Sequence, residues 1–342
     1  MNELSLSTVI FIASGALSFL SAPLFSLALI PVAHRVGAID VPIDARRMHS
    51  HPKARIGGVA VFISFLLGCG LFLGFCRDLF TDSTARLSLC LIFGGGVIVL
   101  GGFFDDTRGL SPWQKIFFQA LAAIVAASFG IKLWEGFSGG FGFILWSILL
   151  SNAFNLIDGL DGLSSRVSAF CLLAILMISG YEPILVVLLS ALLGFIPLNV
   201  HPSRLFLGDA GAMLLGFSLS LCSADVLLST PSFSSLVSII LIFALPLFDT
   251  AYAAARRMLR GKSPFSPDRE HLHHKLVDGG MPHGQASLFL SLVGGGFSSL
   301  GTLVFSVGLT PIFFILLCLL ILVAASVIII STKRSKSDKK DG

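Results

Sequence analysis

Long apolar stretches with almost no charged residues dominate the pattern of hydrophobic and polar positions along the chain. Crossing a hydrocarbon core about 30 Å thick takes about 20 helical residues, and shorter spans are tolerated inside bundles. Their unbroken apolar character is typical of helices, because a membrane β-barrel would show short alternating strands. Eleven stretches meet this description: Thr8–Pro31, Gly57–Cys76, Leu87–Phe104, Ile116–Leu133, Phe141–Leu156, Ser165–Gly180, Pro183–Leu198, Gly211–Leu228, Leu236–Ala255, Ala286–Val307 and Pro311–Ile330. The sequence therefore predicts an all-α, polytopic membrane bundle of about eleven transmembrane helices.

Lysine and arginine are distributed unevenly over the connections between these stretches. Of 23 such residues, 20 fall in alternate connections and in the C-terminal tail, whereas the opposite connections hold only Arg77, Arg86 and Lys132. Because cytoplasmic loops carry the excess of positive residues, we expect the N-terminus outside and the C-terminus in the cytoplasm. Residues 1–331 are predicted to form one transmembrane domain and residues 332–342 a basic cytoplasmic tail.

Composition narrows the protein class further. The chain of 342 residues is 55% hydrophobic and 12% charged, with a mean hydropathy of +0.92. Soluble domains carry about 25% charged residues, so an ordinary soluble enzyme and a disordered chain are excluded. The net charge of +4 is too small to indicate a nucleic-acid partner, and the six cysteines form no CxxC pair that would suggest a metal or redox site.

Candidate chemistry lies in the predicted cytoplasmic connections. Asp105 and Asp106 end the third apolar stretch, shortly before Lys115, and paired carboxylates at a membrane-embedded helix end are costly. Their presence indicates a divalent cation or a positioned base, with a solvated acidic loop as the alternative. Asp209 lies between glycines before another apolar stretch, where it could bind a ligand or only cap that helix.

A second block contains Asn152, Asn155, Asp158 and Asp161. On a helix the first three of these would share one face. Carboxylate and amide oxygens are the ligands that Mg²⁺ prefers, whereas a calcium loop would need a glutamate at its twelfth position. This block therefore favours a Mg²⁺-phosphate site.

Basic and histidine residues form a third group that suits an anionic ligand. Lys53 and Arg55 precede Gly57-Gly58, whose backbone amides we expect near an anion, and Arg269 precedes His271, His273 and His274; zinc is the alternative for the histidines. Asp249, inside an apolar stretch, is as consistent with a structural as with a catalytic role.

The order of these blocks resembles the polyprenyl-phosphate N-acetylhexosamine-1-phosphate transferase family of bacterial inner membranes (glycosyltransferase family 4). The resemblance implies a multi-pass enzyme of the bacterial cytoplasmic membrane that transfers a sugar 1-phosphate from a UDP-N-acetylhexosamine to undecaprenyl phosphate. It also implies release of UMP and a requirement for Mg²⁺, with Mn²⁺ as the alternative metal, and it leaves a homodimer open.

The histidine block distinguishes two branches of this family. The run His271-Leu272-His273-His274 after Ser263–Arg269 resembles the branch that uses UDP-N-acetylglucosamine to start a lipid-linked cell-envelope glycan, such as teichoic acid or lipopolysaccharide. The alternative is a phospho-N-acetylmuramoyl-pentapeptide transferase, which usually has three consecutive histidines. The exact sugar stays open.

The resemblance also suggests roles for the residues. We expect Asp209 and Asn155 to bind the metal. Asp105, Asp106, Asp158, Asp161 and Lys115 are the catalytic candidates, and Asp105 could act as base, nucleophile or positioning group. The substrate-binding candidates are Asn152, His271, His273, His274, Arg269, Lys53 and Arg55. A transporter is a different class of protein that also places Asp residues in membranes, but its sites lie near the bilayer midplane.

The charge asymmetry makes a topology prediction. Single cysteines placed in the 34–56 connection, in the 256–285 connection and in the tail should be labelled by a membrane-impermeant reagent only after the cells are opened. Labelling of intact cells at position 266 would contradict the predicted orientation.

Overall fold

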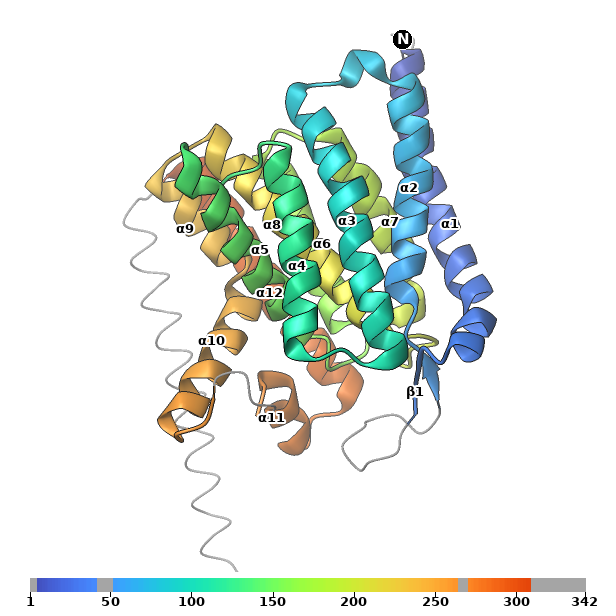
Figure 1. The fold of residues 1–342 in the computed structure, drawn as a ribbon, viewed down its shortest axis with the longest axis vertical. Helices are drawn as coiled ribbons and strands as arrows, with labels where there is room; N and C mark the ends of the chain where they lie inside the picture. The colour runs from blue at the N-terminus through green and yellow to red at the C-terminus, as the bar shows by residue number, and fades with distance from the viewer. Residues whose placement is uncertain (1–4, 42–51, 264–269, 309–342) are drawn as a thin grey trace, which may run out of the picture.

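The computed structural model describes residues 5–41, 52–263 and 270–308. This part of the chain is almost entirely helical (Figure 1), with two short antiparallel strands, β1 (Ile39–Asp40) and β2 (Lys53–Ala54), and one 3-10 turn, η1 (Arg77–Leu79). The α-helices of the described residues are α1 (Leu6–Val36), α2 (Gly57–Phe75), α3 (Asp82–Arg108), α4 (Pro112–Ser128), α5 (Phe137–Leu156), α6 (Leu163–Ile178), α7 (Pro183–Asn199), α8 (Gly208–Ser229), α9 (Phe233–Ile242), α10 (Ala244–Leu259), α11 (Leu272–Asp278) and α12 (His283–Val307). The predicted all-α fold is confirmed.

Six helices are long and apolar enough to cross a membrane, namely α1, α2, α3, α5, α8 and α12, and α9 with α10 would make a seventh span. The helices α6 and α7 are apolar but shorter. Each of the first ten predicted stretches overlaps a helix or a helix pair, so the multi-pass character is confirmed. The eleventh stretch, Pro311–Ile330, and the basic tail lie outside the described residues. The total of eleven spans and the orientation of the termini stay predictions.

Helix α8 lies at the centre of the bundle, where it packs against α2, α3, α5 and α6 (Figure 1). Of its apolar window, 83% is buried inside the protein. A helix that is hydrophobic on every side is typical of such a central position. The first turn of α8 therefore brings Asp209 to one end of the bundle, among the ends of the surrounding helices.

Glycine allows α2 and α3 to approach this first turn very closely. A Cβ added at Gly58 would lie 2.0 Å from the backbone nitrogen of Gly211, and one at Gly102 would lie 2.2 Å from the Cα of Ala210. Inside a bilayer the hydrophobic effect contributes little between helices, so close contact between small residues is a main source of packing. These contacts fix α2, α3 and α8 relative to one another at the end that carries the polar residues.

The segment that leads from β2 into α2 runs beside the segment that leads into α8. Arg55 pairs with Phe206 as an isolated bridge, and the amides of Gly57 and Gly58 donate to the carbonyls of Phe206 and Leu207 over 3.0 and 2.7 Å. The expectation that these two amides face an anion is therefore wrong, because backbone pairing already uses them. The pairing instead places the Arg55 side chain at the start of α8.

The predicted stretch Leu236–Ala255 is not one straight helix. Its two halves, α9 and α10, bend by 77° at Phe243, whose buried ring packs near Trp146 and Phe154 with centroids 6.0 and 6.2 Å away. Apolar periodicity gave no sign of the break, because the residues on both sides of it remain hydrophobic. The bend directs α10 away from the bundle axis, toward α11 (Figure 1).

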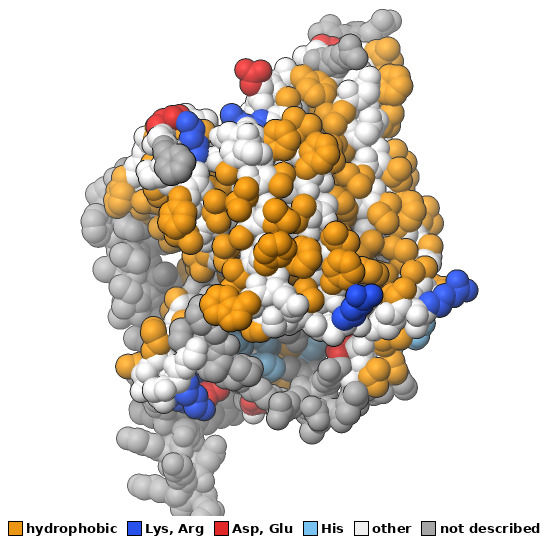
Figure 2. Space-filling model, viewed as in Figure 1, with side chains coloured by type: hydrophobic (Ala, Val, Ile, Leu, Met, Phe, Trp, Pro, Cys, Tyr) orange, Lys and Arg blue, Asp and Glu red, His pale blue; other side chains and the backbone are white. Residues whose placement is uncertain are grey.

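Hydrophobic side chains cover the middle of the face shown in Figure 2, over α3 and α4. Lysine, arginine and acidic side chains of the described residues gather near its two ends. This banded distribution is what a bilayer requires of a spanning protein, because an unpaired charge at mid-depth is expensive.

The close contact at Gly102 generates a stability prediction. Gly102→Ala should destabilise the protein by about 1–3 kcal/mol, the usual cost of overpacking a well-packed contact, because the new methyl group meets the α8 backbone. The matched control is Gly96→Ala in the same helix, where the nearest atom would be 3.9 Å away. Thermal unfolding in detergent should show a lower midpoint for Gly102→Ala alone; equal midpoints for both variants would contradict the close packing.

Candidate active site

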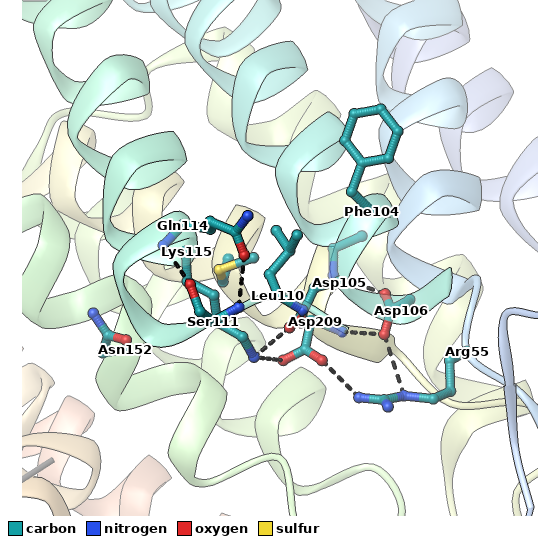
Figure 3. A network of polar contacts seen from close by, with 12 residues as sticks. Arg55, Phe104, Asp105, Asp106, Leu110, Ser111, Gln114, Lys115, Asn152 and Asp209 are labelled. Carbon is teal, nitrogen blue, oxygen red and sulfur yellow. Dashed lines mark hydrogen bonds and ion pairs between the residues drawn. The ribbon is translucent and has the colours of Figure 1, made fainter. Parts of the chain in front are cut away.

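One end of the bundle brings together most of the predicted site residues. The contributions come from the β2–α2 segment, the end of α3, the start of α4 and the first turn of α8 (Figure 3). The α5–α6 turn adds Asp158 and Asp161. Arg55, Asp105, Asp106, Lys115 and Asp209 form one continuous network of ion pairs and hydrogen bonds. Residues up to 154 positions apart in the chain are in direct contact there.

Asp209 is the centre of this network. Its two oxygens face different cations: Arg55 Nη2 lies 2.7 Å from Oδ2, and Lys115 Nζ lies 3.5 Å from Oδ1. The Asn155 side chain and the Asp105 carboxylate lie near Asp209, and Asp105 faces the same Lys115 Nζ. Two neighbouring carboxylates repel each other unless positive charge lies between them, and Lys115 Nζ, which faces both, supplies that charge.

Asp106 has a different function in the network. Its carboxylate accepts hydrogen bonds from the backbone N–H groups of Asp209 and Ala210, at 3.0 and 3.1 Å, and it faces Arg55 Nε at 3.2 Å. A carboxylate at these donors satisfies orphan N–H groups and complements the positive end of the helix dipole. Asp106 on α3 therefore caps the N-terminus of α8. The alternative that Asp209 serves as the N-cap of this helix is wrong, because Asp209 lies inside its first turn.

Asp105 holds the turn between α3 and α4. One of its oxygens accepts the N–H of Leu110 at 2.6 Å, and its other oxygen pairs with Lys115. Ser111 and Gln114 add a capping box that starts α4 at Pro112. The start of α4 is thereby fixed so that Lys115 extends toward Asp105 and Asp209 together, as Figure 3 shows.

The α5–α6 turn carries the next two carboxylates. Helix α5 ends at Leu156, so Asp158 lies in the turn and does not share a helical face with Asn155, contrary to the expectation from spacing. Burial, and after it the charge of Asp209, raises the pKa of Asp158 well above its ordinary value. The charge of Arg55 opposes this rise but does not cancel it, so the environment of Asp158 favours its neutral form.

Asp161 is the opposite case, because it is well compensated. Its Oδ2 accepts the N–H of Ser203 at 3.1 Å and lies 3.4 Å from Lys53 Nζ and 3.1 Å from His201 Nδ1. Although burial opposes the effect, the hydrogen bond from Ser203 and the charge of Lys53 hold the pKa of Asp161 below its usual value. Asp161 is therefore an anion at physiological pH.

Asn152 lies one turn deeper in the bundle than Asn155. Its amide exchanges hydrogen bonds with Gln119 of α4, at 2.8 and 3.4 Å, and donates to the carbonyl of Ile148. In this structure it connects α4 to α5 below the network, and its predicted role in substrate binding stays a prediction.

The histidine block lies against the α5–α6 turn. His271 pairs with Asp249, and His273 is so close to Gly159 that a Cβ there would lie 2.1 Å from His273 Nε2. Burial, with a smaller contribution from His274, lowers the pKa of His273 to about 3, so this ring is neutral at physiological pH. The position of Arg269 lies outside the described residues.

The donor set of the network fits a divalent cation. The site has two more carboxyl groups than cationic side chains; the carboxyl groups are those of Asp105, Asp106, Asp158, Asp161 and Asp209, and the cations are Lys53, Arg55 and Lys115. All the oxygen donors are hard ligands of the kind that Mg²⁺ prefers. The residues that could hold the ion are Asp105, Asp209, Asn155 and Asp158. Asp106 is left out because its carboxylate already accepts the N–H groups at the start of α8.

A second group with metal-ligating side chains includes two histidines that sequence reasoning missed. Among the described residues, Asp161, His201 and His283 have potential ligand atoms within 4.8 Å of one another. His201 and His283 are far apart in the chain and lie outside the recognised blocks, so only the folded structure brings them together. Since Lys53, Ser203 and His201 already contact Asp161 Oδ2, this group is a charge-compensated network more than a metal site.

Known proteins of similar sequence share the region that contains these carboxylates. The family model for glycosyl transferase family 4 matches residues 88–226. The probable undecaprenyl-phosphate N-acetylglucosaminyl 1-phosphate transferase of Bacillus subtilis is 33% identical over 281 residues, covering 77% of this chain and 76% of that protein. The decaprenyl-phosphate N-acetylglucosaminephosphotransferase of Mycolicibacterium smegmatis is 34% identical over 327 residues, covering 82% and 79%. The undecaprenyl-phosphate alpha-N-acetylglucosaminyl 1-phosphate transferase of Escherichia coli K12 is 30% identical over 311 residues, covering 83% and 81%.

The capping role of Asp106 generates a prediction that separates it from its neighbour. Asp106→Asn places an amide N–H₂ against one of the two α8 amides, so one donor loses its acceptor at a cost of about 1–3 kcal/mol. Thermal unfolding should show a clear loss of stability even without added divalent metal. Asp158→Asn is the control: burial already disfavours the charge of Asp158, so a neutral amide there should not destabilise the protein. Wild-type stability of Asp106→Asn would contradict the cap.

Proposed function

Since the chain belongs to glycosyl transferase family 4, we propose that it transfers N-acetylglucosamine 1-phosphate from a UDP-sugar to undecaprenyl phosphate, with release of UMP. The observation that carries the mechanism is that the carboxylates of Asp105 and Asp209 both face Lys115 Nζ, while Asp209 also pairs with Arg55. In this proposal a divalent cation binds at the two carboxylates, with the two basic side chains next to it for phosphate oxygens.

The chemical difficulty of this reaction is charge. An oxygen of the lipid phosphate attacks the β-phosphorus of the UDP-sugar, the bond from that phosphorus to the bridging oxygen breaks, and UMP leaves with the electron pair. Both reactants are anions, so the site must neutralise charge before it can orient them. The network supplies positive charge through Arg55 and Lys115 and a place for a divalent cation at Asp105 and Asp209.

We propose Mg²⁺ as the resident ion, with Mn²⁺ as the alternative, held by Asp209 with Asp105, Asn155 or Asp158. When bound, it would neutralise the diphosphate and the charge that develops on the leaving UMP. The side chains of Lys115 and Arg55, which pair with carboxylates in the structure, can then turn toward phosphate oxygens. In this proposal the carboxylates keep both cations in place until substrate arrives.

Asp105 is better suited to positioning than to deprotonation. A phosphate monoester has a second pKa of about 6, so undecaprenyl phosphate is mostly a dianion at neutral pH and gains little from a base. Asp105 holds the α3–α4 turn through Leu110 and pairs with Lys115, and both contacts orient the lysine. A direct displacement therefore needs no proton transfer from the acceptor.

The donor nucleoside is assigned to the other side of the network. Lys53 Nζ lies 4.9 Å from the centroid of the partly exposed Phe206 ring and 3.4 Å from Asp161. An aromatic face beside an anion and a cation suits a base and a ribose, which need stacking and hydrogen-bonding partners. The histidine block, on Asp158-Gly159, would then face the donor diphosphate between the nucleoside and the metal.

We further propose eleven spans, an external N-terminus and a cytoplasmic C-terminus in a bacterial inner membrane. The described helices and the charge of the connections support this arrangement. The network then lies at the cytoplasmic membrane face, where a water-soluble UDP-sugar and a lipid phosphate can meet.

The decisive experiment measures UMP release by purified protein with undecaprenyl phosphate, Mg²⁺ and a panel of UDP-sugars. We expect turnover with UDP-N-acetylglucosamine that is lost on chelation of the metal. Asp209→Asn should reduce turnover by at least about 10²–10³, the scale for removing one transition-state-stabilising group, without loss of folded protein. Glu135→Gln, at an exposed pair with Lys132, is the control.

Two results would contradict the proposal. Absence of UMP release with every UDP-sugar would exclude the transferase activity. Full activity of Asp209→Asn with an unchanged Mg²⁺ optimum would move the metal away from Asp209.

A further inference from the structure

A buried carboxylate on α10 holds the histidine block in place. Asp249 and His271 are 2% and 5% exposed, and Asp249 Oδ2 lies 2.8 Å from His271 Nδ1. The other oxygen of Asp249 accepts the backbone N–H of Leu272 at 2.9 Å. One side chain therefore contacts both the ring of His271 and the first residue of α11.

Helix α10 also contacts Glu270, the residue before His271. Arg256 lies about two helical turns after Asp249. Its Nη1 donates to the backbone carbonyl of Glu270 at 3.0 Å, and its Nε lies 3.2 Å from the Glu270 carboxylate. Three consecutive residues, 270 to 272, are thus attached to α10 by polar contacts. The histidine block is therefore positioned by α10, not by its own short helix.

The contact with Asp249 determines which nitrogen of His271 carries a proton. A carboxylate is only an acceptor, so Nδ1 must be the protonated nitrogen, whether the ring is neutral or charged. The other nitrogen, Nε2, then points away from Asp249. The ring of His271 also lies parallel to that of His273, with centroids 5.8 Å apart and 5° between the planes, and His273 in turn packs on Gly159 beside Asp158.

We infer that Asp249 is a positioning residue of the donor site, which fixes the ring orientation and the Nδ1–H tautomer of His271 so that Nε2 accepts a hydrogen bond from a hydroxyl or amide N–H group of the UDP-sugar. This inference rests on the proposed function for the identity of the ligand. The contacts that orient the ring are all with protein groups.

The substitution Asp249→Asn tests this role with little change of shape. Its single carbonyl oxygen can still accept the N–H of Leu272, but its N–H₂ group then faces His271 Nδ1, which has to become the unprotonated nitrogen. Carboxylate partners of functional histidines typically contribute 10–100-fold in activity in metal sites, and we expect a loss of kcat/KM of about that size here.

A double-mutant cycle distinguishes positioning from a general structural effect. If Asp249 acts through His271, Asp249→Asn should lower kcat/KM about 10–100-fold when His271 is present and by less than about threefold in the His271→Ala background, because coupled residues are not additive. An equal loss in both backgrounds would overturn the inference. A fall in unfolding temperature with unchanged activity would overturn it as well.

Nitrogen-15 spectra of the histidines provide a readout that needs no substrate. In the wild type, His271 Nδ1 should give the signal of a protonated nitrogen, and in Asp249→Asn it should give that of an unprotonated one. An unprotonated Nδ1 in the wild type would overturn the inference even if the enzyme is active. Conversely, a wild type with the expected spectrum and no UMP release would contradict only the proposed function.

Discussion

The arrangement of the site depends on one interaction, the hydrogen bonds from the first turn of α8 to Asp106 of α3. They form only because Gly102 lets the two helices approach to within contact of their backbones. Gly208 contributes as well: its φ of +75° is readily accessible to glycine, and a Cβ there would lie 2.7 Å from Asp106 Oδ2. With α8 anchored in this way, the adjacent Asp209 cannot move away from Asp105 without breaking the cap.

The network balances charge in two different ways. Arg55 is shared between Asp106 and Asp209, and Lys115 between Asp105 and Asp209, so each cation bridges a structural carboxylate and the central one. Asp158 makes no such bridge, and burial raises its pKa although the charge of Arg55 opposes the rise. The carboxyl group at the α5–α6 turn therefore favours its neutral form, whereas those bridged by Arg55 and Lys115 have a cation beside them.

Much of the fold and many of the site residues could be predicted from the sequence, because both depend on local patterns. Long apolar stretches specify helices, and Asp105, Asp158 and Asp209 occur where such stretches end. What could not be predicted depends on contacts between distant segments. Three such contacts cannot be predicted from the spacing of residues along the chain. They are the hydrogen bond from the N–H of Ala210 to Asp106, the pairing of Asp249 with His271 and the pairing of Asp161 with His201. The bend at Phe243 was missed because both halves of the stretch are apolar.

The glycine contacts also determine which parts of the protein can move. At Gly58 and Gly102 the backbones of α2 and α3 meet that of α8 with no side chain between them that could rearrange, so the three helices form a rigid unit at this end of the bundle. The histidine block is attached differently, through polar contacts from α10, which itself joins the bundle through the bend at Phe243. Polar contacts at a membrane surface can exchange with water on fast timescales, whereas interlocked backbones cannot. We therefore expect ligand entry and release to involve motion of α10 and α11 while the adjoining ends of α2, α3 and α8 stay in place.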